Sequence, residues 1–273
     1  RDVLGSRGLG DVYKRQIVME NFQQIMTKDT EWTQKLKKRL EHLQIHQEST
    51  GQSINCKICN DKGYIFDSEG AVKFCKCKEI KEAKERIEKS PLKARFDKNR
   101  FVSYKTNNPQ RLRASNLCKS YIANFDGTKN LILSGQVGSG KTHLAIATTR
   151  VLIEKVGVTY ADFVNDITRL KFNQLDQEEY TKAVDAYKNA TVLFIDDLYK
   201  GDVSPATQRI VQDIINYRYN NDKAMIITTE LNKNELLDIN EATASRLIEM
   251  SMTDEGEYYI EFVGRELNYR LFK

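Results

Sequence analysis

The chain has 273 residues, of which 40% are hydrophobic and 30% are charged, and its formal net charge is +5. This length allows one large domain with a small one, or two domains. No apolar run approaches the roughly 18 residues of a membrane-spanning helix, and no secretory signal is visible. We therefore expect a cytoplasmic protein without membrane contact, whose modest positive charge permits nucleic-acid binding but does not require it.

The first residues differ from the rest of the chain. Residues 11–16 read DVYKRQ, and this run resembles the translation of a transposase end sequence that is used in sequencing-library adaptors. We therefore interpret residues 1–16 as an adaptor artefact and exclude them from the prediction of the fold. A genuine flexible tail is the alternative, and we expect no function there in either case.

A helix is predicted within residues 20–47. Its apolar residues recur at steps of four, four and three, which places them on one face. They are Trp32, Leu36, Leu40 and Leu43. A single helix cannot bury such a stripe alone, so the stripe must pack within a small N-terminal domain or against a partner.

Four cysteines follow in two close pairs, Cys56 with Cys59 and Cys75 with Cys77. In a cytoplasmic protein such pairs are more typical of metal ligands or free thiols than of disulfides. Four thiolates around a short predicted hairpin favour a closed tetrahedral Zn²⁺ site with a structural role. Because the second pair is C-x-C rather than C-x-x-C, a reduced thiol cluster or an iron–sulfur site remains the alternative.

A change in composition near Pro91 suggests a domain boundary. Residues 76–89 are dense in Lys and Glu and predict a solvated linker helix, which the proline ends. We therefore expect residues 17–90 to form a helical and zinc-binding N-terminal module with its linker. Residues 91–273 are expected to form an ATPase domain.

Strand and helix patterns alternate within residues 91–273. After a predicted helix at 109–125, strands are predicted at 131–134, 158–163, 191–196, 224–228 and 258–262, with helices at 141–155, within 164–189, at 205–220 and within 232–250. This alternation predicts an α/β fold with a parallel, doubly wound sheet. Ligands of such sheets bind at the carboxyl ends of the strands.

Residues 135–142 read GQVGSGKT, a complete G-x-x-x-x-G-K-[ST] phosphate-binding loop. The loop follows a predicted strand and begins a helical pattern, which is the context that the motif requires. Lys141 is expected to reach the β- and γ-phosphates of ATP, and Thr142 to offer its hydroxyl to Mg²⁺. The predicted nucleotide-binding residues are Gly135, Gln136, Val137, Gly138, Ser139, Gly140, Lys141, Thr142 and His143.

Two acids, Asp196 and Asp197, end the strand predicted at 191–196. A carboxylate at this position holds Mg²⁺ in related sites, so Asp196 is expected to do so with Thr142. Asp197 is the candidate for polarising the attacking water, and a helix cap or a loop acid is its alternative role. Since aspartate is one methylene shorter than the glutamate common in this architecture, we expect slow hydrolysis.

The strand predicted at 224–228 ends in Thr228, Thr229 and Glu230. A polar side chain there can lie between the γ-phosphate and the attacking water. Thr229 is our candidate, because Glu230 would repel a phosphate unless it faced a metal or a cation. An ordinary polar strand end is the alternative.

Four segments together resemble the bacterial and phage DnaC-like helicase loaders, which are AAA+ ATPases closely related to the IstB transposition ATPases. They are Gly138-Ser-Gly-Lys-Thr-His143-Leu-Ala145, Leu193-Phe-Ile-Asp-Asp-Leu198, Thr228-Thr-Glu-Leu and Ser245-Arg246-Leu. The resemblance covers about residues 50–273. It implies an AAA+ core, self-association through AAA+ interfaces and ATP-controlled delivery of a replicative hexameric helicase to single-stranded DNA.

The same resemblance assigns two further residues. It implies that Arg246 acts as an arginine finger on the ATP of a neighbouring subunit, and a surface salt bridge is the alternative. Relatives often carry asparagine where Glu230 stands, which makes the chemistry of that position different here. The family often contacts single strands after the second strand, where Arg169 and Lys171 lie.

Aromatic residues near that region, namely Tyr160, Phe163 and Phe172, could stack on bases or belong to the core. Three other functions remain open from the sequence. An IstB-type accessory ATPase would assemble on duplex DNA with a transposase. A small-molecule P-loop kinase would need an acceptor pocket and an Arg-rich lid. A non-catalytic adaptor would bind ATP without turnover.

Overall fold

The structure, a computed structural model, describes residues 56–66, 71–88, 92–173, 176–201, 203–254 and 256–272. The predicted adaptor segment at 1–16 and the predicted helix within 20–47 lie outside these residues. The described part begins with a short antiparallel hairpin of β1 (Tyr64–Phe66) and β2 (Val72–Phe74), in which Ile65 pairs with Lys73. The hairpin leads into α3 (Lys76–Glu88).

Five parallel strands form the central sheet, in the order β4-β5-β6-β3-β9. The strands are β3 (Leu131–Gly135), β4 (Val158–Asp162), β5 (Val192–Asp196), β6 (Met225–Thr228) and β9 (Tyr259–Phe262). The ends of all five strands lie within one residue of their predicted positions. The sequence predicts them well because continuous apolar runs are typical of strands covered on both faces. The predicted α/β fold with a parallel, doubly wound sheet is confirmed.

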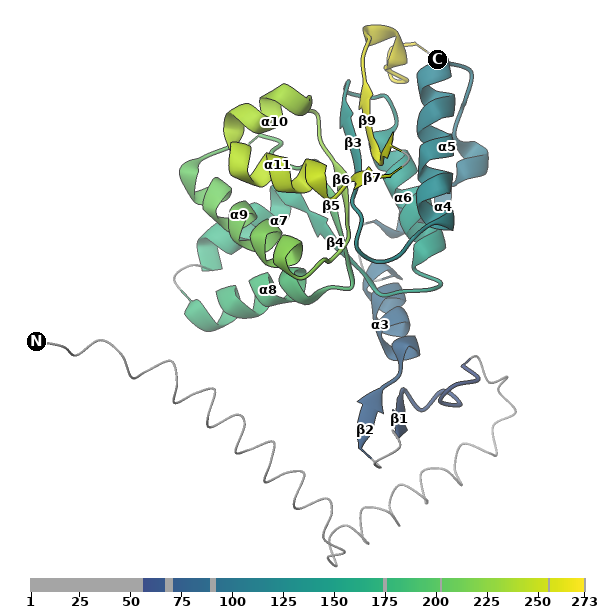
Figure 1. The fold of residues 1–273 in the computed structure, drawn as a ribbon, viewed down its shortest axis with the longest axis vertical. Helices are drawn as coiled ribbons and strands as arrows, with labels where there is room; N and C mark the ends of the chain where they lie inside the picture. Colours follow the sequence, from purple (N-terminus) through teal and green to yellow (C-terminus); the bar gives the residue numbers. More distant parts are fainter. Residues whose placement is uncertain are drawn as a thin grey trace, which may run out of the picture. The chain divides into compact units, whose positions relative to one another are not determined.

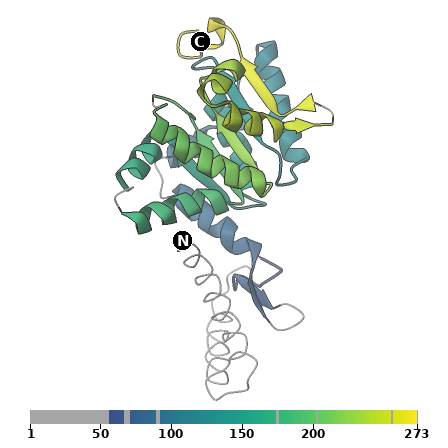
Figure 2. The same ribbon diagram turned by 60° about the vertical axis from the view of Figure 1, so that its left-hand side comes forward.

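Helices cover both faces of this sheet (Figures 1 and 2). One face carries α5 (Pro109–Ala123) and α6 (Lys141–Leu152), with α4 (Lys93–Lys98) packed on α6. The other face carries α7 (Phe163–Asn173), α8 (Gln177–Asn189), α9 (Pro205–Asn220), α10 (Lys233–Ile239) and α11 (Glu241–Glu249). Short 3-10 turns at Phe101–Ser103 and Arg265–Leu267 and a two-residue hairpin of β7 (Met252–Thr253) and β8 (Gly256–Glu257) complete the described elements.

Alternate residues of the strands point into two separate cores. In β3, Leu131 and Leu133 pack with α5 and α6, whereas Ile132 between them packs with the helices of the opposite face. This alternation follows from the two-residue period of a strand. The sheet is therefore packed on both faces, and the loops that could form a site follow the carboxyl ends of its strands.

Helix α3 packs on the same core as α5 and α6. Its Ala83 and Ile87 are buried in the cluster that contains Leu92, Phe96 and Leu144. The remaining described side chains of this helix are exposed or half-buried, and its role as a solvated linker stays a prediction. The division of the chain at residue 90 stays a prediction. Residues on the two sides of this predicted boundary pack in the same core.

Several predicted boundaries differ from the structure by one to three residues, and two of them change the reading of a residue or a helix. The strand predicted at 158–163 ends at Asp162, and Phe163 begins α7 with its ring buried in the core. The helix predicted at 141–155 ends at Leu152, since the next residues form a turn. Among the described residues, no helix combines the length and the apolar character that crossing a bilayer would require.

Candidate nucleotide-binding site and cysteine cluster

The loop between β3 and α6 adopts a conformation that requires glycine at two places. Gly138 and Gly140 have φ angles of +73° and +97°, in the left-handed region that other residues rarely adopt. A side chain on Gly138 would also collide with Asn268, and one on Gly140 would lie 2.7 Å from the ring of Tyr104. The loop is thus held by the residues that pack against it from outside.

Lys141 begins α6 and lies almost fully buried under this loop. Its Nζ donates hydrogen bonds to the carbonyl oxygens of Gly135 at 2.7 Å and of Gln136 at 2.8 Å. Burial lowers the pKa of Lys141 to about 8, although the nearby carboxylates of Glu230 and Asp197 act in the opposite direction. A lysine in this setting gains from a phosphate that would supply the missing counter-charge.

Thr142 and Asp196 meet at the wall of the same site. The Thr142 hydroxyl donates to Asp196 Oδ1 at 2.9 Å, and the Thr228 hydroxyl donates to the same oxygen at 2.6 Å. Burial raises the pKa of Asp196, and the neighbouring Asp197 adds to this effect. A hydroxyl and a carboxylate beside a phosphate loop are hard oxygen donors, so these residues fit Mg²⁺. Thr228 was missed as part of this group.

Asp197, Lys200 and Glu230 form an ion-paired group in the same cavity. Lys200 Nζ lies 2.9 Å from Asp197 Oδ2 and 2.8 Å from Glu230 Oε1. Asp197 has a φ angle of +59°, which turns the chain sharply after β5. The cation that Glu230 was predicted to need is therefore Lys200, which the sequence analysis did not identify.

These groups surround one cavity of about 330 Å³. Its walls combine the phosphate loop, the end of β5, the end of β6 and residues from both flanks of the domain. The lining residues are Arg95, Asn99, Val137, Gly138, Gly140, Lys141, Thr142, His143, Asp197, Lys200, Glu230, Tyr269 and Arg270. The structure thus brings together most of the predicted site residues, and it adds basic and aromatic residues from α4 and the C-terminal segment that no motif marked.

Predicted site residues differ in their distance from this cavity. His143 lines it, and its Nε2 lies 2.9 Å from the carbonyl oxygen of Arg100. Thr229 is fully buried, and its hydroxyl donates to the carbonyl oxygen of Leu198 at 2.9 Å. Arg246 lies on α11 and donates to the carbonyl oxygen of Ala242 at 3.0 Å. Asp196, Thr229 and Arg246 are not among the described residues that line the cavity, and the roles of all the predicted site residues stay predictions.

The model of the IstB-like ATP binding protein family matches residues 63–242, which include the phosphate loop and both strand-end acids. The chain belongs to the IstB-like family of ATP-binding proteins. It is also 31% identical over 245 residues to the phage-like element PBSX protein XkdC of Bacillus subtilis (strain 168), covering 82% of this chain and 89% of that protein. ATP binding therefore follows from the family.

Solved structures of two helicase-loader proteins share the fold of this IstB-like protein. The crystal structure of the DnaC helicase loader is 31% identical and has a TM-score of 0.50, covering 62% of this chain and 99% of that chain. The crystal structure of DnaI has a TM-score of 0.51 at 20% identity, covering 64% and 92%, and at this identity it supports the fold alone. The predicted AAA+ core and the predicted resemblance are confirmed: this IstB-like protein is similar to the DnaC helicase loader and shares its fold.

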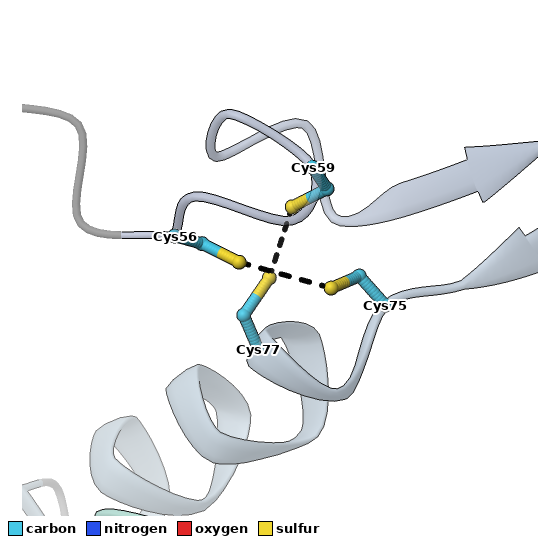
Figure 3. Close-up of side chains that lie close together, drawn as sticks. All are labelled: Cys56, Cys59, Cys75 and Cys77. Atoms are coloured by element: carbon cyan, nitrogen blue, oxygen red, sulfur yellow. Dashed lines mark hydrogen bonds between the residues drawn. The ribbon is translucent and has the colours of Figure 1, made fainter.

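The IstB-like protein also carries its four predicted ligands as a cluster before the AAA+ core. Figure 3 shows the side chains of Cys56, Cys59, Cys75 and Cys77 pointing toward one another from the two ends of the hairpin. All four sulfur atoms lie within 4.8 Å of one another, with 3.3 Å between Cys59 and Cys77 and 3.8 Å between Cys56 and Cys75. Sulfurs around a tetrahedral Zn²⁺ are about 3.8 Å apart, since each Zn–S bond is about 2.3 Å.

Backbone N–H groups stabilise the thiolates of Cys56 and Cys59, whereas burial and the neighbouring cysteines raise the pKa of Cys77, and the pKa of Cys75 is raised as well. The Gly63 N–H donates to the Cys59 sulfur at 3.3 Å. Hydrogen bonds from the backbone N–H groups of Cys59 and Ile58 lower the pKa of Cys56 to about 7. The four cysteines therefore fit Zn²⁺. The ion would link the segment before β1 to the segment after β2, and its four sulfur ligands would leave no open position for a substrate.

The residues considered for contact with single strands lie on β4 and α7, and they differ in exposure. Phe163 is buried, the Tyr160 hydroxyl donates to Asp196 Oδ2 at 3.5 Å, and Phe172 is 76% exposed on α7. Arg169 donates to Asp166 at 3.0 Å, and Lys171 donates to Ser204 at 2.8 Å. Of the three aromatic residues, Phe172 alone presents an open ring for stacking.

Proposed function

We propose that this protein is an ATP-dependent helicase loader that delivers a replicative ring helicase to single-stranded DNA. The observation that carries the proposal is the match to the DnaC helicase loader, which spans 99% of that chain at 31% identity. An IstB-type accessory role, on duplex DNA with a transposase, is the second candidate, because the family model that matches residues 63–242 is the IstB-like one.

In this proposal the residues of the cavity bind ATP and assist its hydrolysis. The phosphate loop and Lys141 hold the phosphates, while Thr142 and Asp196 hold Mg²⁺, which neutralises the developing charge on them. Asp197 orients the attacking water. The cavity lies at the carboxyl edge of the sheet, so ATP binding can change the conformation of the residues that follow β5 and β6.

Arg246 takes part from a second copy of the chain. It lies outside the cavity of its own domain, and its guanidinium centre is 5.6 Å from the ring centre of Tyr219 on the helical face. A finger of this kind acts in trans, so self-association would complete the site. ATP turnover would then depend on assembly around the DNA or the helicase.

The experiment measures ATP hydrolysis and helicase loading with purified components. Hydrolysis should rise with single-stranded DNA and a hexameric replicative helicase, and Lys141→Ala should abolish it while the fold survives. Stimulation by duplex DNA with a transposase, and none by single strands, would favour the IstB-type role. Turnover at the unsubstituted rate in Lys141→Ala would show that the site is misassigned.

A mixing experiment separates action in trans from a structural role of Arg246. Arg246→Ala should bind ATP normally but lose about tenfold or more of the stimulated hydrolysis. Mixing it with Lys141→Ala should recover part of the activity, because one interface then joins an intact loop to an intact finger. If the mixture stays inactive while both variants assemble, action in trans loses its support.

A further inference from the structure

The turn after β5 places Lys200 between two acids from different strands. Asp197 and Tyr199 both have left-handed φ angles, +59° and +61°, a conformation that non-glycine residues adopt only when their surroundings impose it. The turn is tied to β6, since the Asp197 N–H donates to the Thr228 hydroxyl and the Leu198 N–H donates to the Thr228 carbonyl, both at 2.8 Å. Strained backbone held in this way is common where a side chain must be aimed at a ligand.

Lys200 lies in the predicted nucleotide-binding cavity. It lines this cavity together with Lys141 and Thr142. Its side chain is 40% exposed, and its two partners Asp197 and Glu230 are 28% and 32% exposed. The group is therefore open to the cavity and can exchange one partner for another.

The negative charges of Asp197 and Glu230 oppose the binding of a triphosphate, and Lys200 reduces this repulsion. Asp197 and Glu230 are two carboxylates on the wall of a site for a polyanion, and without a cation they would repel its last phosphate. Burial disfavours the ammonium form of Lys200, but hydrogen bonds to Asp197 and Glu230 outweigh this and raise its pKa. Lys200 is therefore charged throughout the physiological range and halves the negative charge of the wall.

We propose that Lys200 is the residue by which this site distinguishes ATP from ADP. It offsets one of the two negative charges of Asp197 and Glu230, so that the γ-phosphate can enter between the phosphate loop and Glu230, and it links that phosphate to the ends of β5 and β6. The backbone of the loop binds the α- and β-phosphates, which ADP shares, and Lys141 reaches the β-phosphate of either nucleotide. The inference deepens the proposed function, since it rests on ATP binding at the same site, but it needs neither hydrolysis nor a helicase.

The test compares the affinities for ATP and ADP, each with Mg²⁺, in the isolated protein. Lys200→Met should raise the Kd for ATP by about tenfold or more and the Kd for ADP by less than about twofold. Adding Glu230→Gln to Lys200→Met should restore the ATP affinity to within about threefold of the original, because it removes the uncompensated charge. Retained ADP binding reports that the variants fold and that the site is intact.

Lys233→Met is the matched control. It breaks a lysine–glutamate pair, Lys233 with Glu257, whose side chains are 39% and 40% exposed and which lies outside the cavity. It should leave both affinities unchanged. An equal loss of ATP and ADP affinity in Lys200→Met, no loss of either, or a failure of Glu230→Gln to restore ATP binding would each overturn the proposal.

The result is separable from the proposed function. If the protein loads no helicase but shows the expected ATP and ADP pattern, the role of Lys200 stands and the loader proposal fails. If loading is confirmed and ATP and ADP respond equally to Lys200→Met, the loader proposal stands and the role of Lys200 fails.

Discussion

The cysteine hairpin and the central sheet depend on different sources of stability. In the hairpin, two three-residue strands leave most of their apolar side chains in solvent, and those of Phe66, Val72 and Phe74 are 51–73% exposed. In the sheet, Leu131, Ile132 and Leu133 are at most 1% exposed. Each large apolar side chain buried in this way contributes about 1.5–3 kcal/mol, a term that the hairpin almost lacks.

The difference shows what each region needs from its bound ion or ligand. Among its described residues the hairpin region buries Cys59 and Cys75 and little else, so we expect a bound metal to supply the free energy that packing does not. The sheet has two cores of its own. We therefore expect a metal to be structural in the first region, whereas a nucleotide would add function to a fold that already exists in the second.

Removal of the metal should have the largest effect on this comparison. We expect about one Zn²⁺ per chain, and chelation should unfold residues 56–78 while the sheet keeps its cooperative unfolding, because structural zinc contributes about 10–16 kcal/mol in small modules. Elemental analysis gives the stoichiometry, and hydrogen exchange gives the protection of each region.

The matched control uses the remaining cysteine of the chain. Cys118 is fully buried in α5, far from the cluster in sequence, and Cys118→Ala should leave the zinc content unchanged, whereas Cys59→Ala should abolish it. Iron in place of zinc, or full protection of the hairpin after chelation, would contradict the assignment.

The sequence predicted those parts of the molecule that depend on local pattern. Apolar runs identified the five strands, and the spacing of the loop residues identified the phosphate-binding loop with Lys141 and Thr142. The cysteine spacing identified all four members of the cluster. These signals lie within short windows, where residue type and period carry the information.

The parts that were missed depend on contacts between distant segments. Lys200 and Glu230 are 30 positions apart in sequence, and their pairing requires the left-handed turn after β5. Tyr269 reaches the loop through its backbone, where its N–H donates to the carbonyl oxygen of Gly138 at 2.9 Å. Thr228 was not identified as a partner of Asp196, because a strand end has two faces and the sequence does not indicate which residue meets that acid.

Arg218, another residue without a sequence signal, offers a test of the sheet region alone. It is fully buried on α9, and its guanidinium donates to the carbonyl oxygens of Tyr187 and Ala190 at 2.8 Å and of Ala224 at 2.6 Å. Arg218→Met should lower the free energy of unfolding by about 3 kcal/mol, because it leaves buried carbonyl groups without donors. Denaturant titration measures this.

The control for Arg218 is Arg209, which is exposed on the same helix. Arg209→Met should change the free energy of unfolding by less than about 0.5 kcal/mol. The zinc content should stay at one ion in both variants if the two regions are stabilised separately. Loss of zinc on Arg218→Met would show instead that the hairpin depends on the sheet.

The smallest expected effect concerns the charge of Lys141. It tests whether the sheet region needs a phosphate to compensate this buried charge. With its pKa lowered to about 8 by burial, Lys141 is charged at pH 7 and largely neutral at pH 9 in the free protein. Phosphate binding needs the charged form, so the affinity for ATP should be constant below pH 8 and fall by up to about tenfold per pH unit above it. Lys200, whose pKa is raised, stays charged over this range and does not contribute.

The stability of the free protein should change in the opposite direction. Because the unfolded chain binds a proton at Lys141 that the folded chain has lost, the free energy of unfolding should rise between about pH 8 and pH 10.5 relative to Lys141→Met, by at most about 1.4 kcal/mol per pH unit. Calorimetric titration with ATP and denaturant unfolding at pH 7, 8 and 9 measure the two trends. An ATP affinity that stays constant to pH 9.5 would contradict this prediction. It would show that the protein already compensates the charge of the Lys141 ammonium without a phosphate. The sheet region, unlike the hairpin, would then hold its charged group without a loss of folding free energy.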